Sequence, residues 1–533
     1  MTDLPHIQVV PEPISATPLV LDYLVGRGRA REFYAGAPES LSAFQEKLAE
    51  VTARFDRPER ERAARALHPT SDRAAARLRK FVEEGGAMIT TGQQAGLFTG
   101  PLYTLYKALT AARLAETLEE RLGVTILPVF WVASEDHDWD EVNHTYLGVP
   151  GDGTVKLALT DPPPAPHPMH DVTLGEGVLP ILDELAQIVE GSPFGAELLT
   201  PIRRAYVPGQ TVAGAFRDVM TELLGPFDFC IIDAGTPGVK EASAGVLERA
   251  LSESVAHERL LAERDRELAE AGYPSQVAVL EGGTNVFFHD ASGRARLYRS
   301  GEGYRTQDAG RSFGEAELIA DVRAHPERFS PNVLLRPVVE SATFPTLAYV
   351  GGPGEISYFA QINALFPAFD IAPPVVYPRA SFTLVEPAMQ RLLDKLGYGV
   401  ADLGRPVHEL FDELARRAMP AEIAMVMEEL ARGVNDGYRR LIEVAGAVDP
   451  TLDDALASLR NQVLARIADS EKKVVRQLKR KEETTVGQLE RVRANLRPEG
   501  EPQDRVLNGI PFLARHGLGL LRDIAAAIQP ELS

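Results

Sequence analysis

The densest group of ionisable side chains in the sequence lies in the segment FWVASEDHDWDEVNH. Seven acids and histidines fall within ten residues there: Glu135, Asp136, His137, Asp138, Asp140, Glu141 and His144. Side chains this close together shift one another's pKa values, so such a cluster can bind an ammonium group, transfer protons or hold a metal ion. The segment lacks a fixed ligand spacing such as HExxH, and we assign no metal ligands. A solvated acidic loop is the structural alternative.

A glycine-rich turn, TTGQQAGLFTGPLYTLYK, is the second segment that could do chemistry. Its glycines let a ligand approach the backbone, and the helix that follows presents its N-terminus to an anion. Lys107, one to two turns into that helix, is placed to reach a phosphate or a carboxylate. A tight strand-to-helix turn with an exposed lysine is the structural alternative. The binding residues predicted in this segment are Gly92, Gln93, Gln94, Thr99, Gly100 and Tyr103.

The third segment is LLRPVVESATFPTLAYVGGPGEISYFAQ. Arg336 and Glu340 flank a stretch stiffened by proline, and a glycine turn follows the apolar run TLAYV. We expect Glu355, Tyr358 and Gln361 to share one face of the short helix after that turn. A strand-to-helix turn with an internal Arg–Glu pair is the structural alternative. The binding residues predicted in and after this segment are Gly352, Gly354, Glu355, Tyr358, Gln361 and Arg379.

The three segments together suit a small zwitterion and an amine acceptor. The acidic loop can hold an ammonium group, while Lys107 and Arg336 can hold a carboxylate. An acid or imidazole of the loop can bind or deprotonate the attacking amine. We predict catalytic roles for Lys107, Asp136, His137, Asp138 and Arg336. In the acidic loop we predict binding roles for Glu135, Trp139, Glu141 and His144.

The elements around these segments follow the rhythm of a parallel α/β sheet. A short buried strand is expected at 87–91, a helix from Pro101 to about Leu122, and a second buried strand, VTILPVFWVAS, that ends at Ser134. Long helices are expected at 202–224 and 239–271. Because the carboxyl ends of parallel strands meet at one edge of the sheet, all three segments should converge on one cleft.

Proline- and glycine-rich stretches interrupt this rhythm, so the core is predicted to be discontinuous. The second interruption contains hairpin-like pieces, NVFFHD and ARLYRSG. We predict core segments at 1–150, 202–274 and 331–385, insertions at 151–201 and 275–330, a helical arm at 386–497, and a C-terminal segment at 498–533 that returns to the core.

The arm has an eleven-residue hydrophobic repeat, in which Leu452, Val463, Val474, Thr485 and Leu496 occupy one column. This repeat gives about 3.67 residues per turn, and predicts a nearly straight helix over 452–496. A second apolar series runs through Ile423, Met427, Leu430, Val434, Tyr438 and Leu441. The VDP turn near Pro450 lets the two helices fold back on each other, so we predict an antiparallel coiled coil.

Composition excludes several classes of protein. The chain has 533 residues, a formal net charge of −20 and one cysteine. An acidic chain does not attract phosphate backbones, so nucleic acid is not an expected partner. Cys230 lies in the apolar run FDFCII and reads as a core residue. The N-terminus lacks the pattern of a signal peptide and no apolar run is long enough to cross a membrane, so a cytoplasmic location is expected.

The ordered combination of TTGQQAGLFTGPLYTLYK, FWVASEDHDWDEVNH, YVGGPGEISYFAQ and the helical arm resembles the cysteine ligases of bacillithiol synthesis. The resemblance covers essentially the whole chain. It implies an α/β Rossmann-like core with two connecting-peptide insertions, and a coiled-coil arm that pairs two subunits into a homodimer. The implied reaction adds cysteine to the amine of malyl-glucosamine (glucosaminyl malate).

The core of that family is similar to class I aminoacyl-tRNA synthetases. Their HIGH signature follows a Gly-Pro-Leu-like lead, and here that lead is followed by Tyr103, Thr104, Leu105 and Tyr106. Both signature histidines and a KMSKS loop are missing, so the cofactor is left unknown and ATP stays one candidate. Two alternatives remain open: a metal-dependent hydrolase or transferase that acts on an amino sugar or thiol conjugate through the Asp/His-rich loop, and a non-catalytic scaffold built on the arm.

Overall fold

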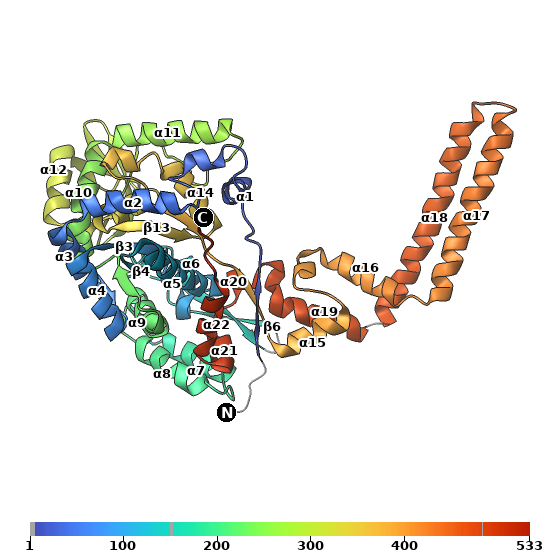
Figure 1. Cartoon of the computed structure of the whole chain (residues 1–533), viewed down its shortest axis with the longest axis horizontal. Helices are drawn as coiled ribbons and strands as arrows, with labels where there is room; N and C mark the ends of the chain where they lie inside the picture. Colours follow the sequence, from blue (N-terminus) through green and yellow to red (C-terminus); the bar gives the residue numbers. More distant parts are fainter. Residues whose placement is uncertain (1–5, 150–152, 482) are drawn as a thin grey trace. The chain divides into compact units, whose positions relative to one another are not determined.

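The computed structural model describes residues 6–149, 153–481 and 483–533 (Figure 1). The chain divides into two compact units. The larger unit contains residues 11–383 and 503–533, and the smaller contains residues 384–502 with a short N-terminal stretch that ends at residue 10. Among the described residues, no helix is both long enough and apolar enough to cross a membrane.

A six-stranded sheet organises the larger unit, in the order β14-β13-β3-β4-β7-β2. The first five strands of this order are parallel, and short β2 pairs antiparallel at the edge. The prediction of a parallel α/β core is therefore confirmed. The strands are β2 (His68–Pro69), β3 (Gly86–Gln93), β4 (Thr125–Val132), β7 (Cys230–Asp233), β13 (Thr346–Gly351) and β14 (Val375–Pro378).

The helix α5 (Leu102–Leu122) connects β3 to β4 and lies against both strands (Figure 1). The helix begins one residue later than the sequence predicts, with Pro101 as its N-cap residue. Three separate helices over residues 41–84 precede β3, and they begin with side-chain caps from Ser40, Asp56 and Ser71. They are α2 (Leu41–Arg54), α3 (Arg57–Arg65) and α4 (Asp72–Glu84).

Each of the two long helices expected further along the chain is two helices. A turn at Pro208 and Gly209 separates α8 (Gly195–Ala205) from α9 (Val212–Leu224), and Gly209 has a φ of +88° that a helix cannot contain. Glu253 leaves helical geometry between α10 (Pro237–Ser252) and α11 (Ser254–Glu270). Local periodicity alone does not reveal these breaks.

Alternate side chains of the central strands fill the core on one face of the sheet. Leu127, Val129 and Trp131 of β4 belong to one buried cluster with Phe81 of α4 and Cys230 of β7. Burial raises the pKa of the Cys230 thiol to about 12. The expectation of a core cysteine is confirmed, because such a thiol stays protonated and is not activated as a nucleophile.

Two insertions, called the first and second additions below, separate the segments of the chain that form the six-stranded sheet. The first contains the hairpin of β5 (His144–Val149) and β6 (Gly153–Ala158), followed by α7 (Val178–Ile188). The second contains a five-stranded sheet in the order β11-β10-β9-β8-β12, and its β8–β9 hairpin is the one that the sequence predicts. Its strands are β8 (Gly283–Asp290), β9 (Gly293–Ser300), β10 (Gly303–Thr306), β11 (Ser312–Gly314) and β12 (Phe329–Pro331).

The remaining helices of the larger unit include the short segments that reach the carboxyl edge of the sheet. A four-residue helix, α6, follows β4, and α14 follows β13. The C-terminal helices of the chain belong to this unit. These helices are α1 (Pro18–Val25), α6 (Trp139–Val142), α12 (Glu315–Ala324), α13 (Arg336–Thr343), α14 (Pro353–Ile362), α20 (Gln503–Val506), α21 (Ile510–His516) and α22 (Gly519–Ala527).

The smaller unit is helical and contains the predicted hairpin. The two long helices α17 (Ala421–Gly446) and α18 (Leu452–Lys481) run side by side (Figure 1). The helix expected over 452–496 is described as α18 and α19 (Glu483–Leu496), with residue 482 between them outside the described residues, and α19 packs against α15 (Pro387–Leu396). Their shared apolar cluster also takes in α16 (Val407–Arg417).

The observed contact face of α17 differs in part from the predicted one. Met427, Val434 and Tyr438 are half-buried, as expected for side chains that face α18. Leu430 and Leu441 were expected on the same face, but their exposed fractions are 52% and 49%. The helix therefore carries a second apolar face that α18 does not cover.

Candidate active site

A cleft of about 810 Å³ lies at the carboxyl edge of the six-stranded sheet. Its walls include residues that directly follow β3, β4, β13 and β14. The strands β3 and β13 are neighbours, and the connections that follow them run in opposite directions along the sheet, from β3 to β4 and from β13 to β14. Open α/β sheets bind their ligands at such a switch point, and all three segments selected from the sequence contribute to this one cleft.

Most of the residues predicted from the sequence line this cleft. Those that do are Gly92, Gln93, Gln94, Tyr103, Lys107, Glu135, Asp136, His137, Glu141, Arg336, Gly352, Gly354, Glu355, Tyr358 and Arg379. Those that do not are Thr99, Gly100, Asp138, Trp139, His144 and Gln361.

The residues outside the lining have contacts that explain their positions. Asp138 accepts a hydrogen bond from the Glu141 N–H and so caps α6. His144 hydrogen bonds through Nδ1 to the side chain of its neighbour Asn143, at 2.8 Å. Gln361 is buried, where its Oε1 accepts from two backbone N–H groups and its Nε2 donates to Asp265. These contacts are local or structural, and they turn the side chains away from the cleft.

The turn between β3 and α5 has an unusual backbone. Phe98, Thr99 and Gly100 follow one another with φ values of 51°, 80° and 69°. Positive φ in residues other than glycine costs of order 1 kcal/mol or more each, so something must hold the turn. The Asn508 side chain donates to the carbonyl oxygens of Phe98 and Gly100 at 2.7 and 2.9 Å. The turn is buried, and it directs Gln93, Gln94 and Tyr103 into the cleft without presenting its own glycines to a ligand.

Lys107 is almost fully buried at the base of the cleft. Its ammonium group donates to the Gly92 carbonyl, to Gln93 Oε1 at 3.3 Å and to Glu355 Oε2 at 2.6 Å. Burial lowers the pKa of Lys107, and the Glu355 carboxylate opposes that shift. The lysine thus connects the end of β3 with the start of α14, the two elements on either side of the switch point.

Glu355 is the matching buried carboxylate. Its Oε2 also accepts from the Gly352 N–H at 2.8 Å, and its Oε1 accepts from the Tyr349 hydroxyl. Burial alone would raise the pKa of Glu355, but Lys107, Tyr349 and Gly352 together hold that pKa below its ordinary value. Glu355 is therefore a fixed negative charge in the wall of the cleft.

The acidic side of the cleft comes from the loop after β4. Gln94 donates to Asp136 Oδ2 at 2.6 Å, and Asp136 Oδ1 accepts from the His137 N–H at 2.8 Å. Partial burial raises the pKa of Glu141, a hydrogen bond from Gln94 opposes this, and the nearby charges of Asp138 and Asp136 raise the pKa further. A carboxylate with a raised pKa is a better proton acceptor than an ordinary one.

His137 faces a cation from the second addition to the sheet. Arg294 Nη1 lies 2.8 Å from His137 Nδ1, and since a guanidinium can only donate, Nδ1 accepts. Burial lowers the pKa of His137, and the Arg294 charge lowers it further. The neutral imidazole therefore carries its proton on Nε2, so its free nitrogen is a hydrogen-bond donor and not a base.

Arg294 is the main residue of the cleft that the sequence did not reveal. It is buried on β9, stacks 3.8 Å above the centre of the Phe287 ring, and also donates to Ser330 Oγ and the Pro331 carbonyl. Burial lowers the pKa of Arg294 to about 10, so it remains a cation at neutral pH. Arg296 lines the same wall, and among the described residues no carboxylate forms an ion pair with it. Other lining residues missed from the sequence are Trp131, Gln276, Phe287, Asn332, Tyr349 and Arg505.

Arg336 forms an ion pair with Glu340, which was the structural alternative to a role for Arg336 in the site. Its Nη1 donates to Glu340 Oε2 at 2.6 Å and its Nη2 to the Tyr358 hydroxyl at 3.3 Å. The guanidinium also lies over the Tyr349 and Trp131 rings. Arg379 is held similarly, by Asp504 at 2.6 Å and by the Tyr103 ring. Both arginines line the cleft with much of their hydrogen-bonding capacity directed at the protein.

Taken together, the fold and the cleft define an α/β enzyme for small polar substrates, with a carboxylate-rich wall at Asp136 and Glu141 and a cationic wall at Arg294 and Arg296. Two family descriptions match the sequence: "Bacillithiol biosynthesis BshC, N-terminal Rossmann-like domain" over residues 6–380, and the C-terminal coiled-coil domain of the same family over residues 382–532. The chain therefore belongs to the BshC family, and it is an enzyme of the ligase class.

Curated relatives are similar in sequence to this chain over nearly its full length. A protein of Solibacter usitatus is 32% identical over 97% of this chain and 96% of its own length. A protein of Salinibacter ruber is 31% identical over 98% and 96%, and one of Geobacillus kaustophilus is 31% identical over 98% of both chains. Each of these relatives bears the name "Putative cysteine ligase BshC".

Proposed function

We propose that this enzyme joins the carboxyl group of L-cysteine to the amine of malyl-glucosamine and forms an amide, as a step of bacillithiol synthesis. The observation that carries the proposal is the presence of both charges in one cleft, where Asp136 and Glu141 lie beside Arg294 and Arg296, and Arg294 Nη1 is 3.7 Å from Asp136 Oδ1. The names of the relatives support cysteine as one substrate. The acceptor rests on the family resemblance of the sequence.

The charges of the cleft suit both substrates. The ammonium group of cysteine matches the carboxylates of Asp136 and Glu141. The malyl group carries two carboxylates, which match Arg294 and Arg296 on the cationic wall, and Arg505 also lines the cleft. A volume of about 810 Å³ lies within the range of small-molecule sites and has room for an amino acid beside a sugar conjugate.

The amide bond requires a neutral amine and an activated carboxyl group. We assign Glu141 as the group that takes the proton from the sugar ammonium, because its raised pKa makes it the better base in the acidic wall. The amine nitrogen then attacks the carbonyl carbon of activated cysteine, the C–N bond forms, and the activating group leaves with the bonding electrons. His137 donates from Nε2, so its place is to bind a developing oxyanion and not to act as the base.

The group that activates the cysteine carboxyl is not assigned, and ATP is one candidate. The positions of the synthetase signature do not offer its imidazoles: Tyr103 lines the cleft, with its hydroxyl bound by Gln93, while Tyr106 is wholly buried. The alternative of a metal-dependent hydrolase acting through the acidic loop has less support. His137 is occupied by Arg294 and His144 by Asn143, so the loop does not assemble a ligand set.

The reaction itself is the test. Purified protein, labelled cysteine and malyl-glucosamine are added to an extract of cells that lack this protein, and the thiol product is followed by mass spectrometry. Product that appears only with active protein supports the proposal. Equal product without the protein would end it. Repeating the assay after nucleotide removal, with ATP restored in a parallel sample, separates the question of activation from the question of substrates.

We further propose that the enzyme is a homodimer through the helical arm. The face of α17 that α18 leaves uncovered bears Val426, Leu430, Leu441 and Val444, all about half exposed or more. These residues lie within about 60° of one another around the helix and form an apolar stripe of two pairs, with Gly433 and Gly437 between the pairs. A second copy of the same helix offers a complementary face. Because thiol synthesis belongs to a reducing compartment, the cytoplasm is the proposed location.

A further inference from the structure

A second group of possible ligands lies outside the cleft lining, where the two additions to the sheet meet. His170 and Asp171 belong to the segment after β6, and His289 belongs to β8. One ligand atom from each of the three residues lies within 4.8 Å of the others. Asp171 Oδ2 is 3.7 Å from His170 Nε2 and 3.4 Å from His289 Nε2. Both imidazoles therefore point the same nitrogen at one carboxylate oxygen.

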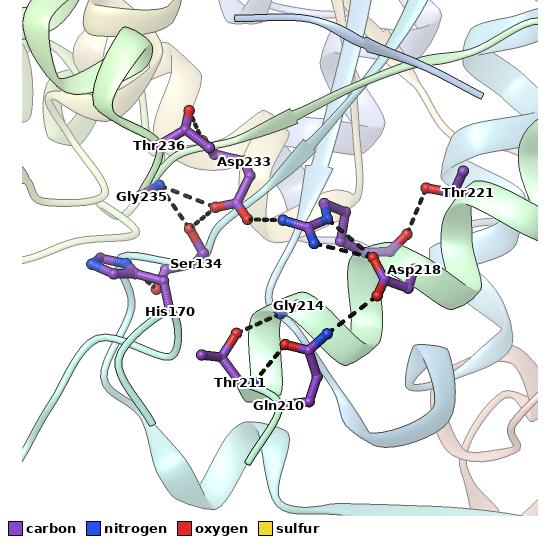
Figure 2. Close-up of polar contacts among 11 residues, drawn as sticks. Ser134, His170, Gln210, Thr211, Gly214, Asp218, Thr221, Asp233, Gly235 and Thr236 are labelled. Atoms are coloured by element: carbon purple, nitrogen blue, oxygen red, sulfur yellow. Dashed lines mark hydrogen bonds and ion pairs between the residues drawn. The ribbon is translucent and has the colours of Figure 1, made fainter. Parts of the chain in front are cut away.

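The contacts of His170 fix which nitrogen is free. Its Nδ1 lies 3.1 Å from the Ser134 carbonyl oxygen, which can only accept, so Nδ1 carries the proton (Figure 2). The lone pair is then on Nε2, the atom that faces Asp171. A backbone carbonyl that binds the far N–H of a histidine is the usual partner of a metal-ligating imidazole, because it sets the tautomer and the ring orientation.

Ser134 is itself held by a buried polar network (Figure 2). Its hydroxyl donates to Asp233 Oδ1 at 2.5 Å and accepts from the Gly235 N–H at 2.9 Å. Arg217 binds the other oxygen of Asp233 at 3.2 Å. The carbonyl that orients His170 is thus anchored at the carboxyl ends of β4 and β7.

Gly235 leaves room for the His170 ring. A Cβ atom on Gly235 would lie 2.5 Å from Cγ and Nδ1 of that ring, closer than atoms can approach. The backbone before the ring is also tied to the sheet, since the His170 N–H donates to the Ser134 carbonyl at 3.0 Å and the Met169 N–H to the Asp136 carbonyl at 2.9 Å. The imidazole is held in place before any ligand arrives.

His289 completes the group of three through its Nε2. Its Nδ1 is buried and makes no hydrogen bond among the described residues, while its Nε2 faces Asp171. Two imidazoles and one carboxylate form a donor set that first-row transition metals prefer and that Mg²⁺ and Ca²⁺ do not.

We propose that His170, Asp171 and His289 bind a divalent transition-metal cation of the zinc class, with water in the remaining coordination position. Bonds of 2.0–2.2 Å in a tetrahedron place neighbouring ligand atoms about 3.3 Å apart, close to the separations observed. The cation links the first addition to the second, directly beside the Ser134–Asp136 loop. None of the three ligands lines the cleft, so the metal positions that loop and takes no part in the reaction.

The test uses the full-length protein after removal of metal by a chelator. Titration with Co²⁺, followed by visible absorption and by calorimetry, should show one site per chain, and Zn²⁺ should displace the cobalt and raise the melting temperature. His289→Ala and Asp171→Asn should weaken Co²⁺ binding by at least about tenfold. Gly235→Ala should weaken it as well, although it removes no ligand. His325→Ala, at an exposed histidine that pairs with Glu327, is the matched control and should bind normally.

Two results would overturn the proposal. One is a wild-type protein that takes up no cobalt at this stoichiometry. The other is a His289→Ala protein that keeps its fold, as judged by circular dichroism, and binds Co²⁺ as tightly as wild type. Either result would mean that the three side chains are an ordinary His–Asp cluster, in which the histidines pair with Asp171 only when protonated.

Discussion

Arg294 Nη1 and His137 Nδ1 lie 2.8 Å apart, although the two residues are separated by 157 positions in the sequence. This contact joins β9 of the second addition to the loop that follows β4. It also determines the tautomer of His137, and through it the chemistry that the imidazole can perform. The second addition is therefore part of the cleft and not an appendage to the sheet.

Arg294→Met should change both activity and the titration of His137. Loss of the nearby positive charge raises the pKa of His137, because Arg294 is one of the groups that lower it. Loss of a charged hydrogen bond should reduce kcat/KM about 10- to 100-fold. Histidine NMR titration and steady-state kinetics measure the two effects. Arg305→Met, on β10 of the same sheet but outside the cleft, is the control, and an equal loss there would refute the assignment.

Glu141→Gln should abolish the base that we assign. The expected loss in kcat is about 100-fold or more, whereas Asp140→Asn, one residue away on α6 and outside the lining, should remain near wild type. The wild-type rate should rise with pH through the pKa of Glu141, which lies above its ordinary value. Asp136→Asn removes a charge that raises this pKa, so the acidic limb of the pH–rate profile should move to lower pH. An unmoved limb would point to another base.

The position of the cleft could be predicted from the sequence because it depends on local order. Each of the three segments directly follows an apolar run, and parallel strands bring their carboxyl ends to one edge. The prediction that Gln361 shares a helix face with Glu355 was wrong. Six residues along a helix with 3.6 residues per turn leave two side chains about 120° apart, so Gln361 does not share the face of Glu355. It binds the backbone at Gln276 and Val277 instead.

The cationic wall had no comparable signal. Arg296 lies in ARLYRSG and Arg294 directly precedes it. The pattern of this hairpin strand predicts a β-structure but not the part of the chain against which it folds. Asn508 was missed for the same reason, since it holds the turn at Phe98 from more than 400 residues away in the sequence. Long-range packing places these side chains, and a pattern of neighbouring residues does not encode it.

The buried pair of Lys107 and Glu355 should matter for stability. Lys107→Met leaves Glu355 buried without its cation, and the expected loss in the free energy of unfolding is about 3–5 kcal/mol. The double variant Lys107→Met/Glu355→Gln should be less destabilised than the sum of the single variants. Lys80→Met, at an exposed lysine near Glu84, should cost below about 1 kcal/mol. Urea denaturation measures the free energy of unfolding of Lys107→Met, Glu355→Gln, the double variant and Lys80→Met. Strictly additive losses in the double variant would contradict a direct pair.

The pH dependence of this stability has a definite sign. The pKa of Glu355 is lower in the folded protein than in the unfolded chain, so its contribution is present above the ordinary pKa and is lost as pH falls through the lowered one. The contribution of His137 to stability has the same pH dependence, because its pKa is also lower in the folded protein and protonation in acid favours the unfolded state. The denaturation midpoint of the wild type should therefore fall in acid, and this fall should be smaller in Glu355→Gln. An equal fall in both proteins would assign the acid sensitivity to other groups.

The last prediction concerns the apolar stripe of α17. A stripe of this kind is unfavourable in water, and pairing with a second copy would bury it. Leu441→Asp places a charge in the middle of the stripe and should convert a dimer into a monomer, because a buried, unpaired carboxylate is costly. Arg440→Asp introduces the same side chain at the adjacent exposed position, off the stripe, and should leave the dimer intact. Light scattering of both proteins at several concentrations, with circular dichroism to confirm helicity, distinguishes the outcomes. If Leu441→Asp remains dimeric while Arg440→Asp also remains dimeric, the subunits pair through another surface.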